Sequence, residues 1–375
     1  MVRIADFFKK ENEPKKEEDS PPEKAPEPIK ASPPSAEQEK GIRFPSYQEI
    51  KEEIIPPDKK PANSSTIEPA QIMKGGVKVE SRVVTETLYH EAVNLAQDIL
   101  EKGSKGEPIE GRKIKEAVDK IVDQLALGNY ELINLTNLAS PENYLLSHSV
   151  NVSILAIMLG LGLNYTRLKL SDLGMAAFLH DIGMLKFEKI ANRPSKLTDE
   201  EYAQIKHHPQ FGAELLRNAK DIPQTAIFVA QEHHEGADGK GYPKGLQGEK
   251  ITEFARIVAI VDSYEALTHP RAQRDSLLPY DALKEMLKRK EHYDQKFLKV
   301  LIDRIGIYPI GSWVQLSTNE IGQVININKN SPLRPVVNIA YDPQGKRSPE
   351  EKVLDLLKYP TLFVKRPVDE KELAK

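Results

Sequence analysis

The side chains best suited to chemistry in this chain are histidines and aspartates spread over its middle third. They are His148, His180, Asp181, His208, His233, His234 and Asp262. Neutral imidazoles and carboxylates suit divalent Fe, Mn, Zn or Ni. Seven ligands exceed the roughly four to six positions of one ion, but fit two ions that share a bridging carboxylate and keep positions for water and substrate. Two such ions a few ångströms apart indicate hydrolysis of a phosphate ester.

A division of these ligands between two metals follows from their pairing. Adjacent residues in a helix point roughly 100° apart, but near a helix end they can converge on one ion or bridge two. Asp181 has two carboxylate oxygens, so we assign it the bridge. A solvent molecule between two divalent ions loses a proton near neutral pH and becomes a nucleophile. One metal is assigned His148, His180 and Asp262, and the other His208, His233 and His234.

A single histidine in a helix is more often structural or exposed than a ligand, and we expect this of His90, His269 and His292. A His-Asp pair alone also arises by chance. The pair gains weight here because a His-His pair and a later aspartate follow it in helical segments. Spacing alone does not decide which of the adjacent His207 and His208 faces the metals.

A glycine-rich segment follows the second histidine pair, and it runs from His233 to Pro243. Two glycines and a proline after a histidine pair predict an abrupt loop at a helix end. Gly239 and Gly241 would let backbone amides approach a ligand closely, while Tyr242 offers a ring and a hydroxyl. An ordinary glycine-rich turn explains the glycines, but not their place beside two histidines.

The surrounding sequence is mostly helical in pattern. Apolar residues recur at three- and four-residue steps from Glu80, and further helices are expected over 111–127 and 131–138 and through 141–305. Thr198 and Glu201 form a capping box, and Pro209 opens a later helix. Alternating residues over 312–316, 321–326 and 336–340 predict a small β-rich unit.

The N-terminal residues have a different composition, with twelve of the 27 prolines before Ala70, mixed with Lys, Glu and Ser. Such a segment buries too little apolar surface to offset its ordering entropy, which predicts disorder. The predicted organisation is a disordered arm, a helical subdomain, a catalytic domain, a β-rich extension and a tail, over 1–74, 77–140, 141–305, 306–366 and 367–375.

Composition narrows the class of protein. The net charge is −3, so the overall field favours neither a nucleic acid polymer nor an anionic membrane. There is no cysteine, which excludes disulfides and zinc–thiolate sites. No signal peptide is apparent, and the most apolar stretch, Ile154–Leu163, is about half of a bilayer span. These features predict a soluble, cytoplasmic protein.

Several segments together closely resemble the HD-GYP family of metal-dependent phosphohydrolases. The match covers about residues 140–305, and the β-rich unit is similar to an extension found after some such domains. The matching segments are His148-Ser149-Val150-Asn151-Val152, His180-Asp181-Ile182-Gly183, His208-Pro209, His233 to Pro243, Ala255-Arg256-Ile257 leading to Asp262, and Tyr264 to Thr268.

The resemblance implies a mainly α fold, with an all-helical HD-type domain, and hydrolysis of cyclic di-GMP to pGpG and, in some members, GMP. It implies two divalent metals, Fe or Mn, held by the seven residues above, and it selects His208 because the family's ligand directly precedes proline. A third metal in some members uses a glutamate where this chain has Tyr144. Substrate phosphate would contact Arg271 and Arg274, and Gly241, Tyr242 and Pro243 would shape the pocket; solvated loop arginines are the alternative for the first two.

Met184 departs from the family pattern, which has lysine directly after His-Asp-Ile-Gly. That lysine is expected to bind phosphate or handle a proton, and Lys186 is a second source of charge. Losing one charge-assisted contact would cost on the order of 100- to 1,000-fold in rate. We therefore also consider a non-enzymatic cyclic di-GMP sensor or adaptor, and another HD nucleotide phosphohydrolase. A protein partner of the arm or of the Gly241–Pro243 loop, and a homodimer, are open alternatives.

Overall fold

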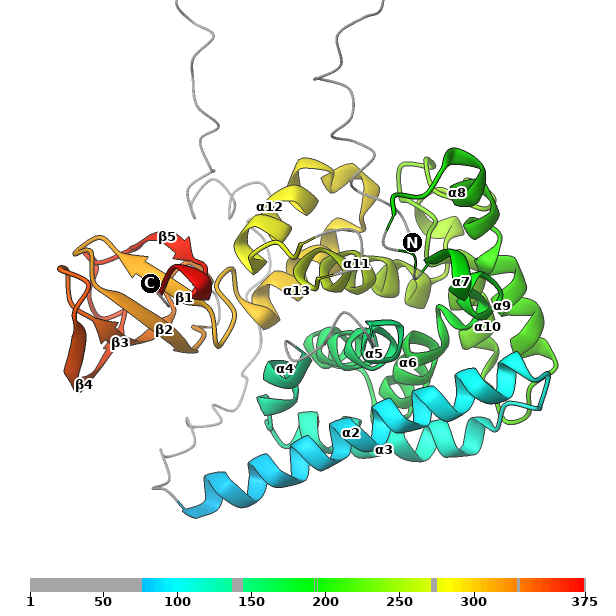
Figure 1. Ribbon diagram of the computed structural model, residues 1–375, viewed down its shortest axis with the longest axis horizontal. Helices are drawn as coiled ribbons and strands as arrows, with labels where there is room; N and C mark the ends of the chain where they lie inside the picture. Colours follow the sequence, from blue (N-terminus) through cyan, green and yellow to red (C-terminus); the bar gives the residue numbers. More distant parts are fainter. Residues whose placement is uncertain are drawn as a thin grey trace, which may run out of the picture. The chain divides into compact units, whose positions relative to one another are not determined.

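The computed structural model describes residues 76–136, 144–191, 193, 195–270, 275–328 and 331–373. These residues are mainly helical, with one small antiparallel sheet near the C-terminus, which confirms the predicted fold class (Figure 1). The disorder predicted for residues 1–74 concerns a segment outside the described residues.

The helical part consists of α-helices joined by short 3₁₀ turns. Its α-helices are α2 (Gly76–Ser104), α3 (Gly111–Ala126), α4 (Glu131–Leu135), α5 (Tyr144–Gly162), α6 (Arg167–Leu179), α7 (Glu188–Ala191), α8 (Asp199–Ile205), α9 (His208–Arg217), α10 (Gln224–Glu232), α11 (Glu253–Thr268), α12 (Pro279–Lys288) and α13 (Gln295–Ile305). The 3₁₀ turns are η4 (Ile182–Phe187), η5 (Gly248–Lys250) and η6 (Lys290–His292).

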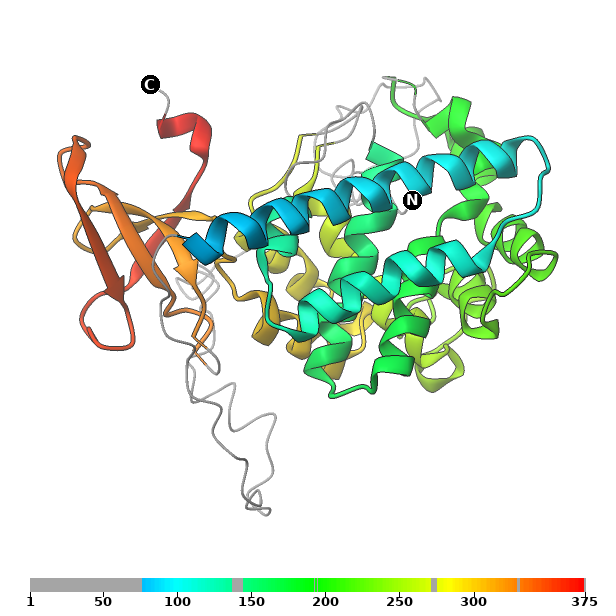
Figure 2. The same ribbon diagram turned by 90° about the horizontal axis from the view of Figure 1, so that it is seen from below.

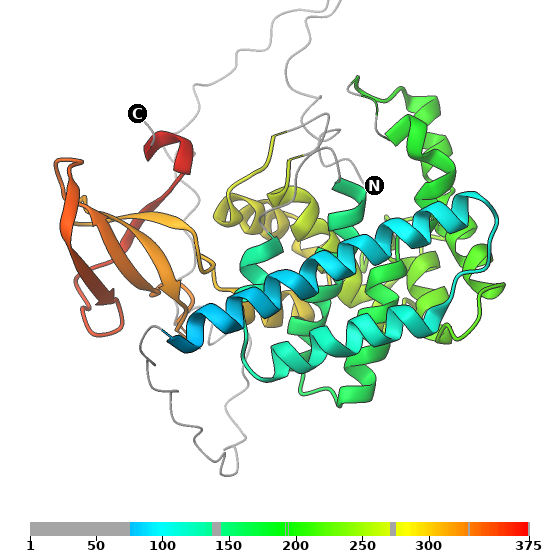
Figure 3. The same ribbon diagram turned by 60° about the horizontal axis from the view of Figure 1, so that its bottom comes forward.

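Helices α2 and α3 lie side by side as a hairpin (Figures 2 and 3). The buried face of α3 follows the three- and four-residue spacing predicted from the sequence, because that spacing places side chains on one side of a helix. Its buried residues are Gly111, Ile114, Val118, Ile121, Val122 and Leu125.

Helix α5 is the centre of the helical part and packs against α2, α6, α11 and α13. It is buried on nearly all sides, as expected for a helix that is apolar all round. By length and composition this helix could cross a membrane, but 78% of its apolar window is buried inside the protein. The sequence prediction understated its apolar length by starting at Ile154.

Side-chain caps and a proline mark the starts of three helices. The capping box predicted for α8 is confirmed, with Thr198 Oγ1 accepting from Glu201 N at 3.2 Å and Glu201 Oε2 accepting from Thr198 N at 2.9 Å. Thr166 caps α6 in a similar way, and Pro209 lies in the first turn of α9, as predicted.

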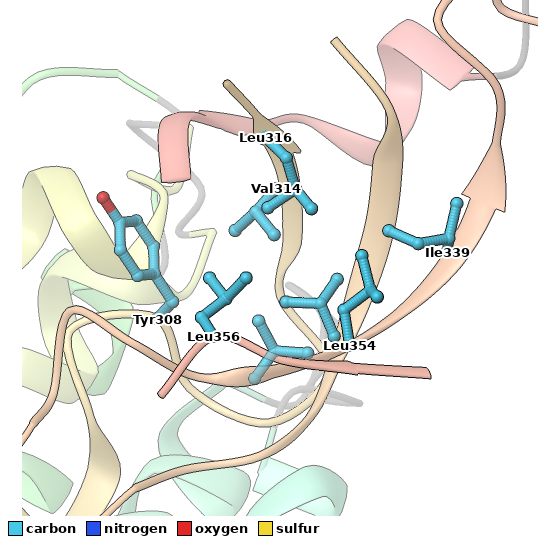
Figure 4. Packing of buried hydrophobic residues seen from close by; sticks show 8 residues of the cluster. Tyr308, Val314, Leu316, Ile339, Leu354 and Leu356 are labelled. Atoms are coloured by element: carbon cyan, nitrogen blue, oxygen red, sulfur yellow. The ribbon is translucent and has the colours of Figure 1, made fainter. Parts of the chain in front are cut away.

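The C-terminal sheet has the strand order β4-β3-β2-β1-β5, with all neighbours antiparallel. Its strands are β1 (Trp313–Leu316), β2 (Ile321–Asn326), β3 (Val336–Tyr341), β4 (Arg347–Asp355) and β5 (Val364–Val368), and the short helix α14 (Glu370–Leu373) follows. Val314, Leu316, Ile339, Leu354 and Leu356 pack on Tyr308 in its core (Figure 4). The sequence analysis identified β1, β2 and β3 but missed the two edge strands.

Candidate metal centre

The seven predicted ligands come from five segments of the chain, and the structure brings them all together in the helical part. Each of the seven residues is buried, and none is more than 7% exposed. His148 lies in α5, His180 and Asp181 follow α6, His208 begins α9, His233 and His234 follow α10, and Asp262 lies in α11.

Asp181 lies between two groups of ligand atoms, and its two oxygens face different groups. Oδ1 is 3.1 Å from His208 Nε2 and 3.4 Å from His233 Nε2. Oδ2 is 3.7 Å from His148 Nε2 and 3.6 Å from His180 Nε2. A carboxylate with this placement can bridge two cations.

The ligand atoms form two compact groups around this carboxylate. Asp181, His208, His233 and His234 offer atoms within 4.8 Å of one another, and so do His148, His180 and Asp262. In the second group His148 Nε2 lies 3.2 Å from Asp262 Oδ1. The histidines divide between these two groups in the same way as in the assignment from the sequence.

Three of these histidine rings are oriented by a contact of Nδ1 with a backbone carbonyl. Nδ1 lies 2.7 Å from the Ala177 carbonyl oxygen in His180, 2.8 Å from that of Ile205 in His208, and 2.9 Å from that of Val229 in His233. A carbonyl only accepts, so Nδ1 must carry the proton and Nε2 presents a lone pair to the centre. This is the tautomer that a metal-binding imidazole needs.

The ionisation states differ among the ligands. Burial alone would lower the pKa of His148, but the nearby Glu265 and Asp262 raise it to about 10, so a metal must displace a proton from this ring. Burial lowers the pKa of both His180 and His208 to about 4, so both rings are neutral at pH 7. Burial alone would raise the pKa of Asp262, but the neighbouring His148 lowers it to about 2. The pKa of Asp181 is also lowered, chiefly because the nearby His180 outweighs its burial. The carboxylates are therefore charged, and His180 and His208 are neutral.

A cation resolves an otherwise unfavourable arrangement of acceptors. His180 Nε2 and Asp181 Oδ1 are buried and make no hydrogen bond within the described part of the chain. With Nδ1 protonated in His208 and His233, their Nε2 lone pairs also face one another at 3.3 Å. Buried acceptors without a donor are costly. The buried histidine nitrogens and carboxylate oxygens therefore fit divalent metal ions. This supports the prediction that the chain binds metal.

Gly183 allows the segment after Asp181 to approach α9. A Cβ at this position would fall within 3.0 Å of the His208 carbonyl oxygen and of Gly212 N. These are backbone atoms, which cannot move aside as a flexible side chain could. The glycine of the His-Asp-Ile-Gly segment therefore has a packing role that places Asp181 beside His208.

Glu265 contacts the predicted metal ligand His148. Glu265 was given no role in the sequence analysis. Its side chain is fully buried, and Oε2 contacts His148 Nδ1. Oε2 also accepts from the Tyr144 hydroxyl at 3.0 Å, and Oε1 accepts from Asn151 Nδ2 at 3.0 Å. Glu265 and Asp262 are three residues apart on one helix, so both face α5. This spacing was the one signal in the sequence that could have identified Glu265.

The Gly241–Pro243 loop packs directly on the second histidine pair. The Tyr242 ring stacks on His234 with 4.7 Å between centroids, and Tyr242 N donates to the His234 carbonyl at 3.0 Å. Glu235 holds the rest of the loop by accepting from Lys244 N and Leu246 N at 2.7 and 2.9 Å. The Tyr242 hydroxyl is buried and makes no hydrogen bond to the residues that the structure describes.

The remaining predicted residues have different outcomes. His208 is buried in the centre, whereas His207 is exposed and contacts Gln210. His269 is buried but lies outside both groups, beside Glu265. Pro243 lies in the loop and is partly exposed. Arg271 and Arg274 lie outside the described residues.

Met184 is buried rather than placed at the centre. It is 1% exposed and packs in an apolar cluster with Phe187 and Ile205. Lys186 Nζ lies 4.9 Å from the Phe211 ring centroid. Position 184 therefore contributes packing in this chain, and its side chain offers neither charge nor a proton.

The sequence also matches known families. A model described as an HD domain matches residues 130–297, and a model of a KOW domain associated with an HD domain matches residues 313–375. The cyclic di-GMP phosphodiesterase PA4108 of Pseudomonas aeruginosa is 32% identical over 252 residues, which cover 67% of this chain and 61% of that protein. The cyclic di-GMP phosphodiesterase PdeB of Borreliella burgdorferi is 30% identical over 198 residues, 52% of each chain.

The chain thus spans between about half and three fifths of the length of these curated relatives. Among solved structures, Bd1817, an HDG"Y"P protein from Bdellovibrio bacteriovorus, has the same fold with a TM-score of 0.50 and 21% identity. The similarity covers 63% of this chain and 74% of that one. The match to the HD domain and the buried histidine–aspartate groups agree on the class of site.

Proposed function

Because the chain carries an HD domain with the sequence signature of the HD-GYP family, we propose that it is a metal-dependent cyclic di-GMP phosphodiesterase. It hydrolyses the cyclic dinucleotide to pGpG, and to GMP if a second cleavage follows. The observation that carries the proposal is the position of Asp181, with one oxygen facing each of two groups of histidine nitrogens. The names of the relatives from Pseudomonas aeruginosa and Borreliella burgdorferi support this choice of substrate.

The cofactors of the proposed reaction are two divalent ions, Fe or Mn. When bound, such ions activate water and neutralise charge on phosphate. His148, His180 and Asp262 would hold one ion, and His208, His233 and His234 would hold the other. Asp181 would offer one oxygen to each ion, and the carbonyl contacts of Nδ1 direct Nε2 of His180, His208 and His233 toward the centre.

The substrate is held beside this centre by groups of the chain itself. Arg271 and Arg274 hold phosphate, since a guanidinium matches phosphate oxygens in a planar fork. Gly241, Tyr242 and Pro243 shape the wall next to His234.

The test compares two adjacent histidines. Protein purified without oxygen is analysed for iron and manganese and assayed with cyclic di-GMP. The wild type and His207→Gln should contain about two metals per chain and turn over the substrate. His208→Gln should lose metal and at least about 100-fold in rate, because it removes a ligand. Equal effects of the two substitutions would contradict the assignment of the ligands.

A sensor or adaptor that binds cyclic di-GMP without hydrolysing it is the second candidate function. The burial of Met184 favours it, because no cation replaces the family's lysine at that position. The intact ligand set opposes it. Binding of cyclic di-GMP without turnover, in protein loaded with both metals, would establish this alternative.

The setting proposed for the activity is the cytoplasm. The described helix that is apolar enough to cross a membrane is instead a buried core helix, α5. A protein partner of the N-terminal arm or of the Gly241–Pro243 loop, and a homodimer, are compatible with this setting. No nucleic acid polymer is part of the proposal.

A further inference from the structure

Lys206 lies at the C-terminal end of α8, two residues before the ligand His208. Its ammonium nitrogen is 4.9 Å from the centroid of the Tyr202 ring and 5.2 Å from that of the Tyr242 ring. The side chain is partly buried. Two aromatic rings therefore hold one cation in a defined place, as cation–π contacts do.

The Lys206 ammonium is close to the candidate metal centre. One of its two rings, Tyr242, stacks on His234 with 4.7 Å between centroids. Adding the two distances places Lys206 Nζ no more than about 10 Å from the centre of the His234 imidazole. A dinucleotide with one phosphate at the metals would have other polar groups within reach of this cation.

No carboxylate neutralises this cation among the residues that the structure describes. Lys169 provides a contrast, because its ammonium lies 3.6 Å from the Tyr165 ring centroid but also 3.2 Å from Glu253 Oε2. Lys206 has the rings without the carboxylate. An ammonium without a protein counter-ion beside a phosphate-binding centre is available to an anionic ligand.

We propose that Lys206, held between Tyr202 and Tyr242, binds the phosphate of the cyclic dinucleotide that is not being cleaved. This inference rests on the proposed function and specifies how its substrate is held. Cyclic di-GMP has two phosphodiester groups, and the metal centre neutralises only one at a time. Lysine is a compact point charge that binds phosphate without strict geometry. Lys206 thus supplies a positive charge that Met184 does not.

The test distinguishes binding of the second phosphate from cleavage of the first by comparing substrates with two phosphodiester groups and with one. Lys206→Met and Lys206→Arg are assayed with cyclic di-GMP and with bis(p-nitrophenyl) phosphate, which has a single phosphodiester. Lys206→Met should raise KM for cyclic di-GMP by about 10- to 100-fold, the worth of one charged hydrogen bond. Its kcat, its metal content and its KM for the small substrate should stay near the wild-type values. Lys206→Arg should recover most of the loss.

Lys186→Met is the matched control, because Lys186 also lies over an aromatic ring, Phe211. Among the described residues this ring stacks on no histidine ligand. The control should keep the wild-type KM for cyclic di-GMP. An unchanged KM in Lys206→Met, equal losses for both substrates, or the same loss in Lys186→Met would each overturn the inference.

Failure of the proposed function gives a different result. If the metal-loaded wild type binds cyclic di-GMP without turnover, calorimetry with the same variants replaces the kinetic assay. Weaker binding by Lys206→Met alone would then support the phosphate site while rejecting the hydrolytic function. A wild type that neither binds nor cleaves cyclic di-GMP would reject both.

Discussion

Replacing Glu265 by glutamine should weaken one metal site selectively. Glu265 is fully buried behind His148 and receives hydrogen bonds from Tyr144 and Asn151. Burial alone would raise the pKa of Glu265, but the nearby His148 outweighs it and lowers the pKa below its usual range. The carboxylate is therefore ionised, and it accepts hydrogen bonds from Tyr144 and Asn151. Glutamine keeps the shape but brings an NH₂ group into a site built from donors.

The expected loss of metal affinity follows from the position of Glu265, which contacts a metal ligand and not the metal itself. His148 must keep its proton on Nδ1 so that Nε2 can bind the ion, and Glu265 fixes that proton. Loss of such a partner typically weakens metal affinity by about 10- to 100-fold, or roughly 1.4 to 2.7 kcal/mol. Facing the amide NH₂ against buried donors should also lower the free energy of unfolding by about 1–3 kcal/mol.

The measurement is a competition between metal-free protein and a chromophoric chelator, which reports the affinity of each site. Glu232→Gln is the control, because this buried carboxylate accepts only from Thr252 N at 2.9 Å among the described hydrogen bonds, and glutamine can still accept there. Glu265→Gln should weaken one of two sites and leave the other within about threefold. Two unchanged affinities, or an equal loss at both sites, would refute the role assigned to Glu265.

Two further outcomes follow from burial. Met184→Lys should lower the free energy of unfolding by about 3 kcal/mol or more, because it buries a charge in an apolar cluster. Denaturant titration beside Met184→Leu measures this loss, and an equally stable and more active Met184→Lys variant would contradict it. The metal-free protein should lose stability as the pH falls from about 6.5 to 5, because burial lowers the pKa of His180 and His208 to about 4 and the unfolded chain takes up protons first. Thermal melts across that range test this, and a flat stability would count against neutral buried rings.

Local sequence patterns were enough to predict much of the fold. The spacing of apolar residues predicted α3, and the Thr198–Glu201 pair predicted the start of α8. Strands β4 and β5 were missed because each contains a proline and several charged residues, which weaken the alternating pattern. Both are edge strands, where proline and charge are tolerated. Their pairing depends on β3 and β1, and not on their own composition.

The candidate ligands could be identified from the sequence because histidine and aspartate are uncommon in apolar helices unless they have a function. The orientation of their rings could not be. It depends on carbonyl groups such as that of Ala177 and on Glu265, which is separated from His148 by most of the domain's sequence. The choice of His208 over His207 needed the family pattern, and in the structure only His208 is buried.

Met184 shows why a substitution within a motif must be judged in three dimensions. By position alone, the loss of a lysine indicates a weakened site, and Lys186 is the nearest replacement along the chain. In the structure Lys186 lies over Phe211, whereas Lys206 lies over the tyrosine that stacks on His234. The metals need ligands at fixed distances, which constrains those positions tightly. A phosphate needs only a cation within reach, so the positive charge that binds it can come from another helix. In this chain we assign that charge to Lys206, at the end of α8, and not to position 184.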